Sequence, residues 1–207
     1  MLLRHGEAVG NAEGRLLGRI DSPLTKRGLD QAARLAHLLD PASSVSRVIA
    51  SPLARARSTA ESLGLDVTIE TDERWIEVDY GSYDGELLSG VPSAVWSSWR
   101  ADPGYRPPGG ETLRELGVRV RSACEELFGA DGVGARIVDS DVIVVSHVSP
   151  IKAAVCWALG APDVTAWRMW LATGSLTVIG WGAGTPVLRG YNMAPADDPA
   201  DDRAEKA

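Results

Sequence analysis

Four side chains that could act together in chemistry stand where short apolar runs of this chain end. Arg4 and His5 follow the run LL. Arg55 comes soon after the run VIA, and His147 closes the run DVIVVS. An arginine is a permanently charged planar donor that suits a phosphate or a carboxylate, and a histidine serves as a general base or as a nucleophile. Gly6 lets the chain bend sharply and lets a ligand approach, so LLRHG predicts a strand that ends in a reactive turn.

The elements that must position these residues alternate between strand and helix. Apolar or β-branched runs predict strands before Arg4 and at residues 48–50, 67–69, 141–146, 176–181 and 187–189. Apolar spacing and capping residues predict helices at residues 26–39, 52–63, 111–128 and 151–159. This alternation is typical of the α/β class, and we expect a three-layer α/β/α sandwich with a mostly parallel central sheet.

The ends of parallel strands would bring the candidate residues together. In open α/β sheets the turns that follow the strands gather at one edge, where ligands bind. Ser51 and Pro52 predict a capping hydroxyl and a first-position proline for the helix that carries Arg55. This arginine would then lie in the first helical turn, beside an end that already attracts anions. His147 would occupy the strand-to-helix turn before Pro150, where the next helix starts.

Cations that converge in this way need a negative partner. Two arginines and two histidines about 4 Å apart would repel one another by several kcal/mol in a partly screened site if both histidines were protonated. A phosphate dianion removes the conflict, because it accepts several charge-assisted hydrogen bonds of about 1.5–3 kcal/mol each. The loop from Asn11 to Asp21 could add backbone N–H groups to the same anion. A phosphomonoester is therefore the ligand that these residues favour.

Two further segments could complete a site. The stretch from residue 72 to 81 is rich in carboxylates, among them Glu77, although any of these acids could simply face water. Residues 87–110 look like an excursion from the sheet that could cover the site, and its Trp96 and Trp99 either line that site or only pack the excursion onto the body. We expect one domain over residues 1–192, followed at 193–207 by an acidic tail with little apolar content to bury and hence no order.

Composition argues against several classes of function. A net charge of −7 opposes binding to a nucleic-acid backbone, and no apolar run is long enough to cross a membrane. Cys124 and Cys156 lie far apart without a paired-cysteine motif, so we expect buried thiols and a cytoplasmic protein. The residues before Arg4 are too few for a secretory signal, and they form an unusually short strand that is either truncated or begins upstream of Met1. Composition leaves the oligomeric state open.

Seven motifs in one order resemble the histidine phosphatase superfamily, which is also called phosphoglycerate mutase-like. They are RHGE with Asn11 after it, GRLLG, DSPLT, SPLARARSTA, the spacing Glu77…Gly81…Gly85, PPGGET and VVSH. The similarity extends over nearly all of residues 1 to 192. It implies an enzyme that needs no metal or other cofactor and that acts on small phosphate esters through a phosphorylated histidine.

The resemblance also implies a role for each site residue. His5 corresponds to the histidine that is phosphorylated, and Arg4, Arg55 and His147 correspond to the phosphate pocket. Glu77 corresponds to the acid that protonates the leaving oxygen. Asn11, the backbone near Gly18 and the backbone N–H of Val148 would make further phosphate contacts. Since Glu77 must be protonated to assist an alkoxide, we expect activity to fall at alkaline pH.

The chain departs from the family pattern after its second reactive histidine. The family often has two glycines there, whereas this chain has VSP; the run SHVSPIK resembles the phosphatase half of bifunctional ribonuclease H/acid phosphatases and the α-ribazole phosphatase-like group. At the acid segment it has EVDYG instead of the mutase branch's Glu-Arg-His-Tyr-Gly, and Arg106 stands alone where mutases have an arginine pair. These differences favour a phosphatase. A phosphoglycerate mutase and a non-catalytic phosphate sensor or scaffold remain the alternatives.

Overall fold

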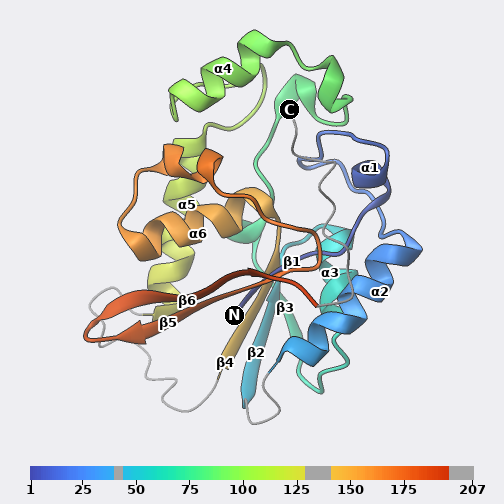
Figure 1. Cartoon of the computed structure of the whole chain (residues 1–207), viewed down its shortest axis with the longest axis vertical. Coiled ribbons are helices and arrows are strands. Elements are labelled where there is room, and N and C mark those ends of the chain that lie inside the picture. The colour runs from blue at the N-terminus through green and yellow to red at the C-terminus, as the bar shows by residue number, and fades with distance from the viewer. Residues whose placement is uncertain (40–43, 129–140, 196–207) are drawn as a thin grey trace.

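A computed structural model describes residues 1–39, 44–128 and 141–195 of the chain. Its strands form one six-stranded sheet in the order β3-β2-β4-β1-β5-β6 (Figure 1). The strands are β1 (Leu2–Arg4), β2 (Val45–Ala50), β3 (Ile69–Thr71), β4 (Asp141–Ser146), β5 (Leu176–Gly182) and β6 (Thr185–Met193). Strands β1 to β4 pair in parallel, while β5 and β6 run antiparallel. The predicted mostly parallel sheet is thus confirmed.

Helices cover the sheet on both faces. The α-helices are α1 (Val9–Ala12), α2 (Lys26–Leu35), α3 (Ala54–Glu61), α4 (Ser93–Ala101), α5 (Leu113–Phe128) and α6 (Val148–Leu159). Short 3₁₀ turns are η1 (Ala36–Leu38), η2 (Glu73–Trp75), η3 (Gly81–Tyr83), η4 (Leu88–Gly90) and η5 (Asp163–Arg168). Helix α2 is shorter than predicted, because its last residues tighten into η1.

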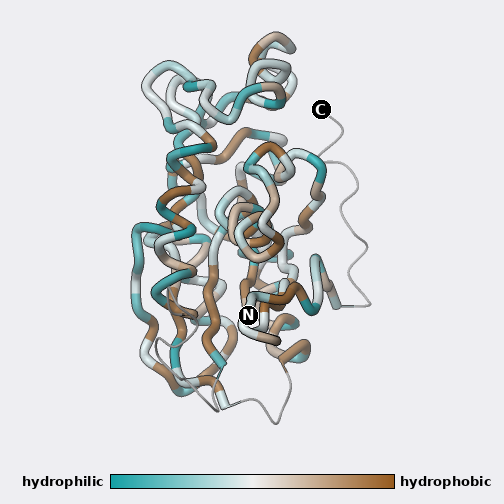
Figure 2. Tube along the Cα trace, turned by 90° about the vertical axis from the view of Figure 1, so that its left-hand side faces the viewer, coloured by the Kyte–Doolittle hydropathy of each residue, from teal (hydrophilic) through white to brown (hydrophobic). Residues whose placement is uncertain are grey.

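Alternating strand residues divide the core into two halves. Leu3 and Val145 pack with Ala56 of α3 and Leu35 of α2 on one face. Their strand neighbours Leu2 and Val144 join a larger cluster with α5 and α6 on the other face. This is the period-2 alternation of a strand whose two faces are both buried, and it produces the three layers. In the side view of Figure 2, hydrophobic stretches lie mainly through the middle of the molecule.

Several predicted boundaries were wrong. Helix α6 begins at Val148, directly after His147, rather than at Pro150, and α5 begins at Leu113 rather than at residue 111. Strand β3 lies at Ile69–Thr71 rather than at 67–69, because an edge strand tolerates the polar residues Glu70 and Thr71. Strand β6 runs on to Met193, so the predicted tail begins too early; residues 196–207 lie outside the described residues. Helix α3 begins at Ala54 with Leu53 as its N-cap, and Ser51 does not cap it.

The segment from 87 to 110 leaves the sheet as predicted. It contains η4 and α4, and Figure 1 shows α4 at the top of the molecule, away from the strands. Trp99 is buried there and forms edge contacts with Tyr80, Tyr83 and Tyr105. Cys124 and Cys156 are buried free thiols, as predicted. Within the described residues, no helix combines the length and apolarity needed to cross a membrane.

Candidate active site

Neighbouring parallel strands bring the two reactive histidines together. Arg4 at the end of β1 is paired with Ser146 at the end of β4, and the His5 N–H donates to the Ser146 carbonyl at 3.0 Å. His5 and His147 are therefore the first residues beyond the two strands. Their rings contact edge to face with centroids 5.0 Å apart.

One hydrogen bond determines which nitrogen of His5 can react. Its Nδ1 lies 2.7 Å from the Gly6 carbonyl oxygen in a buried contact. Since a carbonyl only accepts, Nδ1 carries the proton, and Nε2 keeps its lone pair. Burial, followed by the charges of Arg55 and Arg4, lowers the pKa of His5 well below its usual value. His5 is thus neutral, with a free lone pair on Nε2.

The turn after His5 is held by close packing on α2. A Cβ on Gly6 would lie 2.1 Å from the Gly28 carbonyl oxygen, and one on Gly28 would lie 2.0 Å from the Glu7 carbonyl oxygen. The Gly6 N–H also donates to Thr59 Oγ1 at 3.1 Å, on α3. Only glycine at both positions permits this approach, which holds the turn after His5 between α2 and α3.

A loop ahead of α2 holds the guanidinium of Arg55. This fully buried side chain donates to the carbonyl oxygens of Gly18 at 2.6 Å and Ile20 at 2.9 Å. The amides of Gly18, Arg19 and Ile20 face the other way and donate to the Asp84 carboxylate at 2.7, 2.7 and 2.9 Å. The sequence predicted that the backbone near Gly18 contacts phosphate, whereas in the structure these amides donate their hydrogen bonds to Asp84.

The ring of His147 is oriented by Ser51, the residue predicted to cap α3. Nε2 of His147 lies 2.6 Å from Ser51 Oγ, and both residues are fully buried. Burial, followed by the neighbouring charge of Arg55, lowers the pKa of His147 well below its usual value, so this ring is also neutral. Among the described residues, neither His147 Nδ1 nor Arg55 Nε has a hydrogen-bond partner. Buried polar atoms of this kind normally have a hydrogen-bond partner. A phosphate oxygen would accept from Arg55 Nε, and from His147 Nδ1 in the tautomer whose Nε2 accepts the Ser51 hydroxyl proton.

Glu77 is a buried carboxyl at the same place. It is 2% exposed, and its two oxygens accept the N–H of Val78 at 2.7 Å and that of Ser149 at 3.4 Å. Arg119 of α5 donates to the Glu77 carbonyl at 3.2 Å and so holds the segment. Burial raises the pKa of Glu77, although these N–H groups and Arg55 act in the opposite direction. Such a carboxyl can carry a proton when a leaving oxygen needs one.

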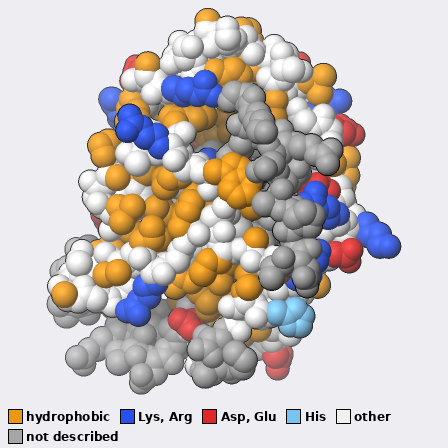
Figure 3. All heavy atoms as spheres, in the orientation of Figure 1, with side chains coloured by type: hydrophobic (Ala, Val, Ile, Leu, Met, Phe, Trp, Pro, Cys, Tyr) orange, Lys and Arg blue, Asp and Glu red, His pale blue; other side chains and the backbone are white. Residues whose placement is uncertain are grey.

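These residues meet at a cavity of about 240 Å³. Arg4, His5, Asn11, Glu77 and Val148 line it, whereas Arg55 and His147 are fully buried and, like Gly18, are not part of the wall. Figure 3 shows a hollow below α4, bordered by hydrophobic side chains and by lysine or arginine side chains. The structure therefore gathers every candidate except Gly18, and the role of each stays a prediction.

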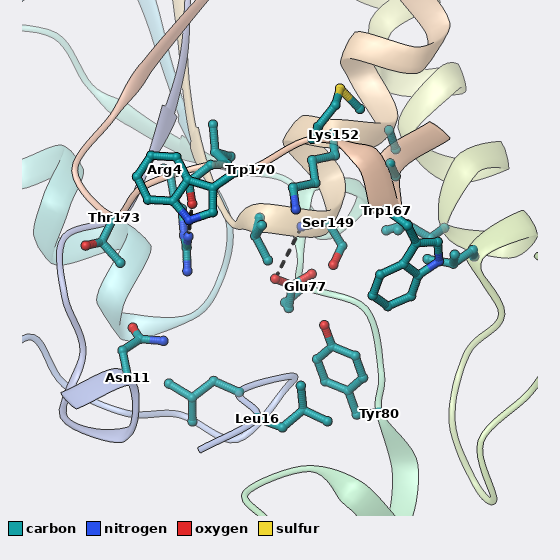
Figure 4. Close-up of a pocket in the computed structure, with 18 of the residues that line it drawn as sticks. Arg4, Asn11, Leu16, Glu77, Tyr80, Ser149, Lys152, Trp167, Trp170 and Thr173 are labelled. Atoms are coloured by element: carbon teal, nitrogen blue, oxygen red, sulfur yellow. Dashed lines mark hydrogen bonds between the residues drawn. The ribbon is translucent and has the colours of Figure 1, made fainter. Parts of the chain in front are cut away.

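Other lining residues were missed from the sequence. Figure 4 shows Lys152, Trp167, Trp170 and Thr173 around Glu77. Lys152 follows Val148 by one turn of α6, a spacing that could have identified it. The tryptophans lie in a stretch without helical or strand periodicity, so only the three-dimensional structure shows that they line the cavity. Of the aromatic residues in the excursion, Trp96 lines the cavity and Trp99 packs behind it.

The described residues contain no group of three or more histidine, cysteine or acidic side chains that could hold a metal ion.

Comparison with known proteins identifies the family. The profile of the histidine phosphatase superfamily (branch 1) matches residues 1–194. The chain belongs to this superfamily. A bifunctional protein of Mycobacterium tuberculosis is 31% identical to this family member over 186 residues, which cover 86% of the chain and 49% of that protein. The chain thus spans about half the length of the first curated relatives it matches.

Two other similarities bear on the activity of this histidine phosphatase superfamily member. The probable phosphoglycerate mutase GpmB of Photorhabdus laumondii is 32% identical over 206 residues, 95% of this chain and 91% of that protein. The crystal structure of an α-ribazole phosphatase from Shigella flexneri superposes with a TM-score of 0.78 at 25% identity, covering 93% of this chain and 95% of that one. Phosphatases and mutases are therefore both among its relatives.

Proposed function

We propose that this protein is a metal-independent phosphomonoesterase that acts on a small phosphorylated metabolite through a phosphohistidine at His5. The observation that carries the proposal is the hydrogen bond from His5 Nδ1 to the Gly6 carbonyl, which leaves a neutral Nε2 as the nucleophile. Near it, Arg55 Nε and His147 Nδ1 are buried nitrogens without a hydrogen-bond partner among the described residues. A phosphoryl group seated against His5 would satisfy both.

In the first step, Nε2 of His5 attacks phosphorus and the bond from phosphorus to the ester oxygen breaks. Arg4, Arg55 and His147 stabilise the charge on the three equatorial oxygens. Glu77, protonated because burial raises its pKa, gives its proton to the departing alkoxide. The alcohol leaves, and the phosphoryl group stays on Nε2.

In the second step, water attacks the phosphohistidine. Glu77 is now a carboxylate, and it takes a proton from the attacking water. The P–N bond breaks and its electron pair returns to Nε2, while the Gly6 carbonyl keeps the proton on Nδ1. Inorganic phosphate leaves, and the site returns to its starting protonation state.

A phosphoglycerate mutase is the second candidate, because GpmB proteins are among the relatives. The structure gives it less support. Arg106, the only arginine at the position of the mutase pair, donates to the Gly110 carbonyl at 2.9 Å and to Glu115 at 2.5 Å. It is exposed and is not part of the cavity wall. A non-catalytic phosphate sensor is the third candidate. It has less support, because a protein that only binds phosphate would need neither a neutral nucleophile nor a buried acid.

One assay separates the three candidates. Metal-free hydrolysis of p-nitrophenyl phosphate that is lost in His5→Ala supports the phosphatase. The matched control is His37→Ala, which changes an exposed histidine and should leave the rate unaltered. Efficient isomerisation of phosphoglycerate without ester hydrolysis would identify a mutase, and phosphate binding with neither activity would identify a sensor.

A further inference from the structure

The cavity has two chemically different ends. Around His5 and Glu77 it is polar, whereas the remaining wall is largely apolar. The apolar wall includes Leu16, Leu88, Trp96, Leu113, Trp167 and Trp170. A phosphate ester bound at His5 must place its alcohol portion against this wall. The wall therefore selects which alcohol fits.

Two tryptophans flank the space where the alcohol begins. In Figure 4, Trp170 and Trp167 lie on opposite sides of Ser149 and Glu77. Glu77 is the acid proposed to protonate the leaving oxygen, so the alcohol begins beside Glu77 in the cavity that both tryptophans line. Flat side chains on either side favour a flat ligand, because aromatic rings attract one another in stacked and edge-on arrangements.

The aromatic wall is rigid. Trp96 meets Trp167 edge to face, with centroids 6.3 Å apart and an interplanar angle of 86°. Trp99, only 2% exposed, lies behind both rings, 5.4 Å from Trp96 and 6.5 Å from Trp167. Because the core already fixes these rings, a ligand that contacts them has little side-chain entropy to remove.

Beyond the polar end, Arg15, Arg100, Lys152 and Asp163 also line the cavity, and the structure already engages the two arginines. Arg15 is paired with Glu13 at 2.6 Å, and the Arg100 guanidinium lies 6.0 Å from the centre of the Trp96 ring. Lys152 points toward Ser149 in Figure 4. A polyol would lose its hydrogen bonds to water against the indoles without replacement there, whereas an aromatic ring would not.

We propose that this site selects phosphate monoesters whose alcohol carries a flat aromatic or heteroaromatic ring. The inference rests on the proposed phosphatase function and specifies its substrate class. Of the two alternatives that the sequence left open for the excursion, Trp96 lines the cavity, whereas Trp99 lies outside its wall.

Paired substrates test the proposal. 2-Phenylethyl phosphate, ethyl phosphate and glycerol phosphate all release alkyl alcohols of low acidity, so they differ mainly in what meets the wall. We expect kcat/KM for the phenylethyl ester to exceed that for the ethyl ester at least tenfold, as one aromatic contact of about 1.4 kcal/mol would give. This ratio should fall severalfold in Trp170→Leu and in Trp167→Leu. It should persist in Trp181→Leu, which changes a tryptophan outside the wall that stacks on Phe128. A ratio near one in the wild type, a preference for glycerol phosphate, or a ratio that ignores Trp167 and Trp170 would overturn the proposal.

A binding measurement separates this proposal from the proposed function. Benzylphosphonate and methylphosphonate cannot be hydrolysed, so their affinities for His5→Ala, measured by calorimetry, do not require catalysis. Tighter binding of benzylphosphonate than of methylphosphonate, reduced in Trp170→Leu, would support the aromatic site even if no ester were cleaved. The absence of ester cleavage would then count against the proposed phosphatase function alone. Equal affinities would refute the aromatic site even in an active enzyme.

A different set of contacts supports a second inference. We infer that Asp84 is a positioning residue for Arg55. The segment 18–20 lies between them: its amides donate to Asp84, and its carbonyls at Gly18 and Ile20 accept from Arg55. The two terminal nitrogens of Arg55 are thus directed by a loop whose shape the Asp84 carboxylate sets.

A double-mutant cycle tests this coupling. Asp84→Ala should weaken competitive inhibition by inorganic phosphate about tenfold, with Asp84→Asn in between, because an amide has one acceptor oxygen. Glu86→Gln, an exposed acid two residues away, is the control. The effects of Asp84→Ala and Arg55→Lys on phosphate inhibition should be strongly non-additive. Additive effects, or a loss of thermal stability with unchanged phosphate inhibition, would show that Asp84 has only a structural role.

Discussion

Glu77→Gln is the substitution whose effect should depend most on the substrate. The replacement keeps the shape of a side chain that is 2% exposed and is held by the Val78 and Ser149 amides. It removes the proton that the leaving alkoxide needs. General acids of this kind contribute about 10²–10⁴ in rate, which corresponds to roughly 2.7–5.4 kcal/mol of barrier at 1.36 kcal/mol per tenfold.

The assay compares kcat/KM for an alkyl ester and for p-nitrophenyl phosphate. The parameter kcat/KM reports only the steps up to phosphorylation of His5, so the later role of Glu77 as a base does not affect it. We expect Glu77→Gln to lose about 10²–10⁴ with ethyl phosphate. With p-nitrophenyl phosphate it should lose less than about tenfold, since that leaving group departs as a stable anion.

The pH dependence provides an independent check. Because the pKa of Glu77 is raised, its protonated form persists above the range of an ordinary carboxyl, and kcat/KM for ethyl phosphate should fall as pH rises through that raised pKa. The pKa of His5 is lowered, so the free Nε2 lone pair is lost only under distinctly acidic conditions. Glu77→Gln should abolish the alkaline fall. Equal losses with both substrates, or an alkaline limb unchanged in the variant, would refute the role of Glu77 as general acid.

Further predictions concern residues that support the site. Ser51→Ala should lower kcat/KM for p-nitrophenyl phosphate roughly tenfold to a hundredfold, because it removes the hydrogen bond that orients His147; an unchanged rate would contradict this. Gly6→Ala should destabilise the fold by about 1–3 kcal/mol or more, since its Cβ would lie 2.1 Å from the Gly28 carbonyl oxygen. Thermal denaturation should show a lower Tm for it than for Gly90→Ala, where the nearest atom is 4.0 Å away. Trp99→Ala should reduce the free energy of unfolding in urea by about 3–5 kcal/mol, and a loss no larger than that of the half-buried Trp181→Ala would count against its place at the centre of the aromatic cluster.

Much of the fold could be predicted because local patterns coincide with burial. The run DVIVVS predicted β4 residue for residue, since a strand buried on both faces must be continuously apolar. Edge strands do not need that pattern, so β3 was predicted two residues too early and β6 was predicted too short. Ser51-Pro52 had the chemistry of a helix start, but the strand end brings the Ser51 hydroxyl to His147 instead. Local sequence cannot show such a tertiary contact.

The site residues could likewise be predicted only where a local sequence pattern determines their position. Arg4, His5 and His147 could be placed because they directly follow strands that pair with each other. The involvement of Asp84 could not be predicted, because it depends on a loop 64 to 66 residues away in sequence whose amides turn toward it. The same holds for Trp167 and Trp170, whose position relative to Glu77 is set by the packing of η5 beside α4 and α6.

The central claim is that His5 Nε2 accepts the phosphoryl group. The most direct test is to quench the enzyme in alkali during turnover of p-nitrophenyl phosphate, whose leaving group does not need the Glu77 proton, and to map the phosphorylated residue by mass spectrometry under conditions that preserve phosphohistidine. A phosphoryl group on His5 that is absent in His5→Ala and accumulates in Glu77→Gln, where water is no longer activated, would support the account. Hydrolysis without any phosphorylated His5, or with the phosphoryl group on His147, would contradict it.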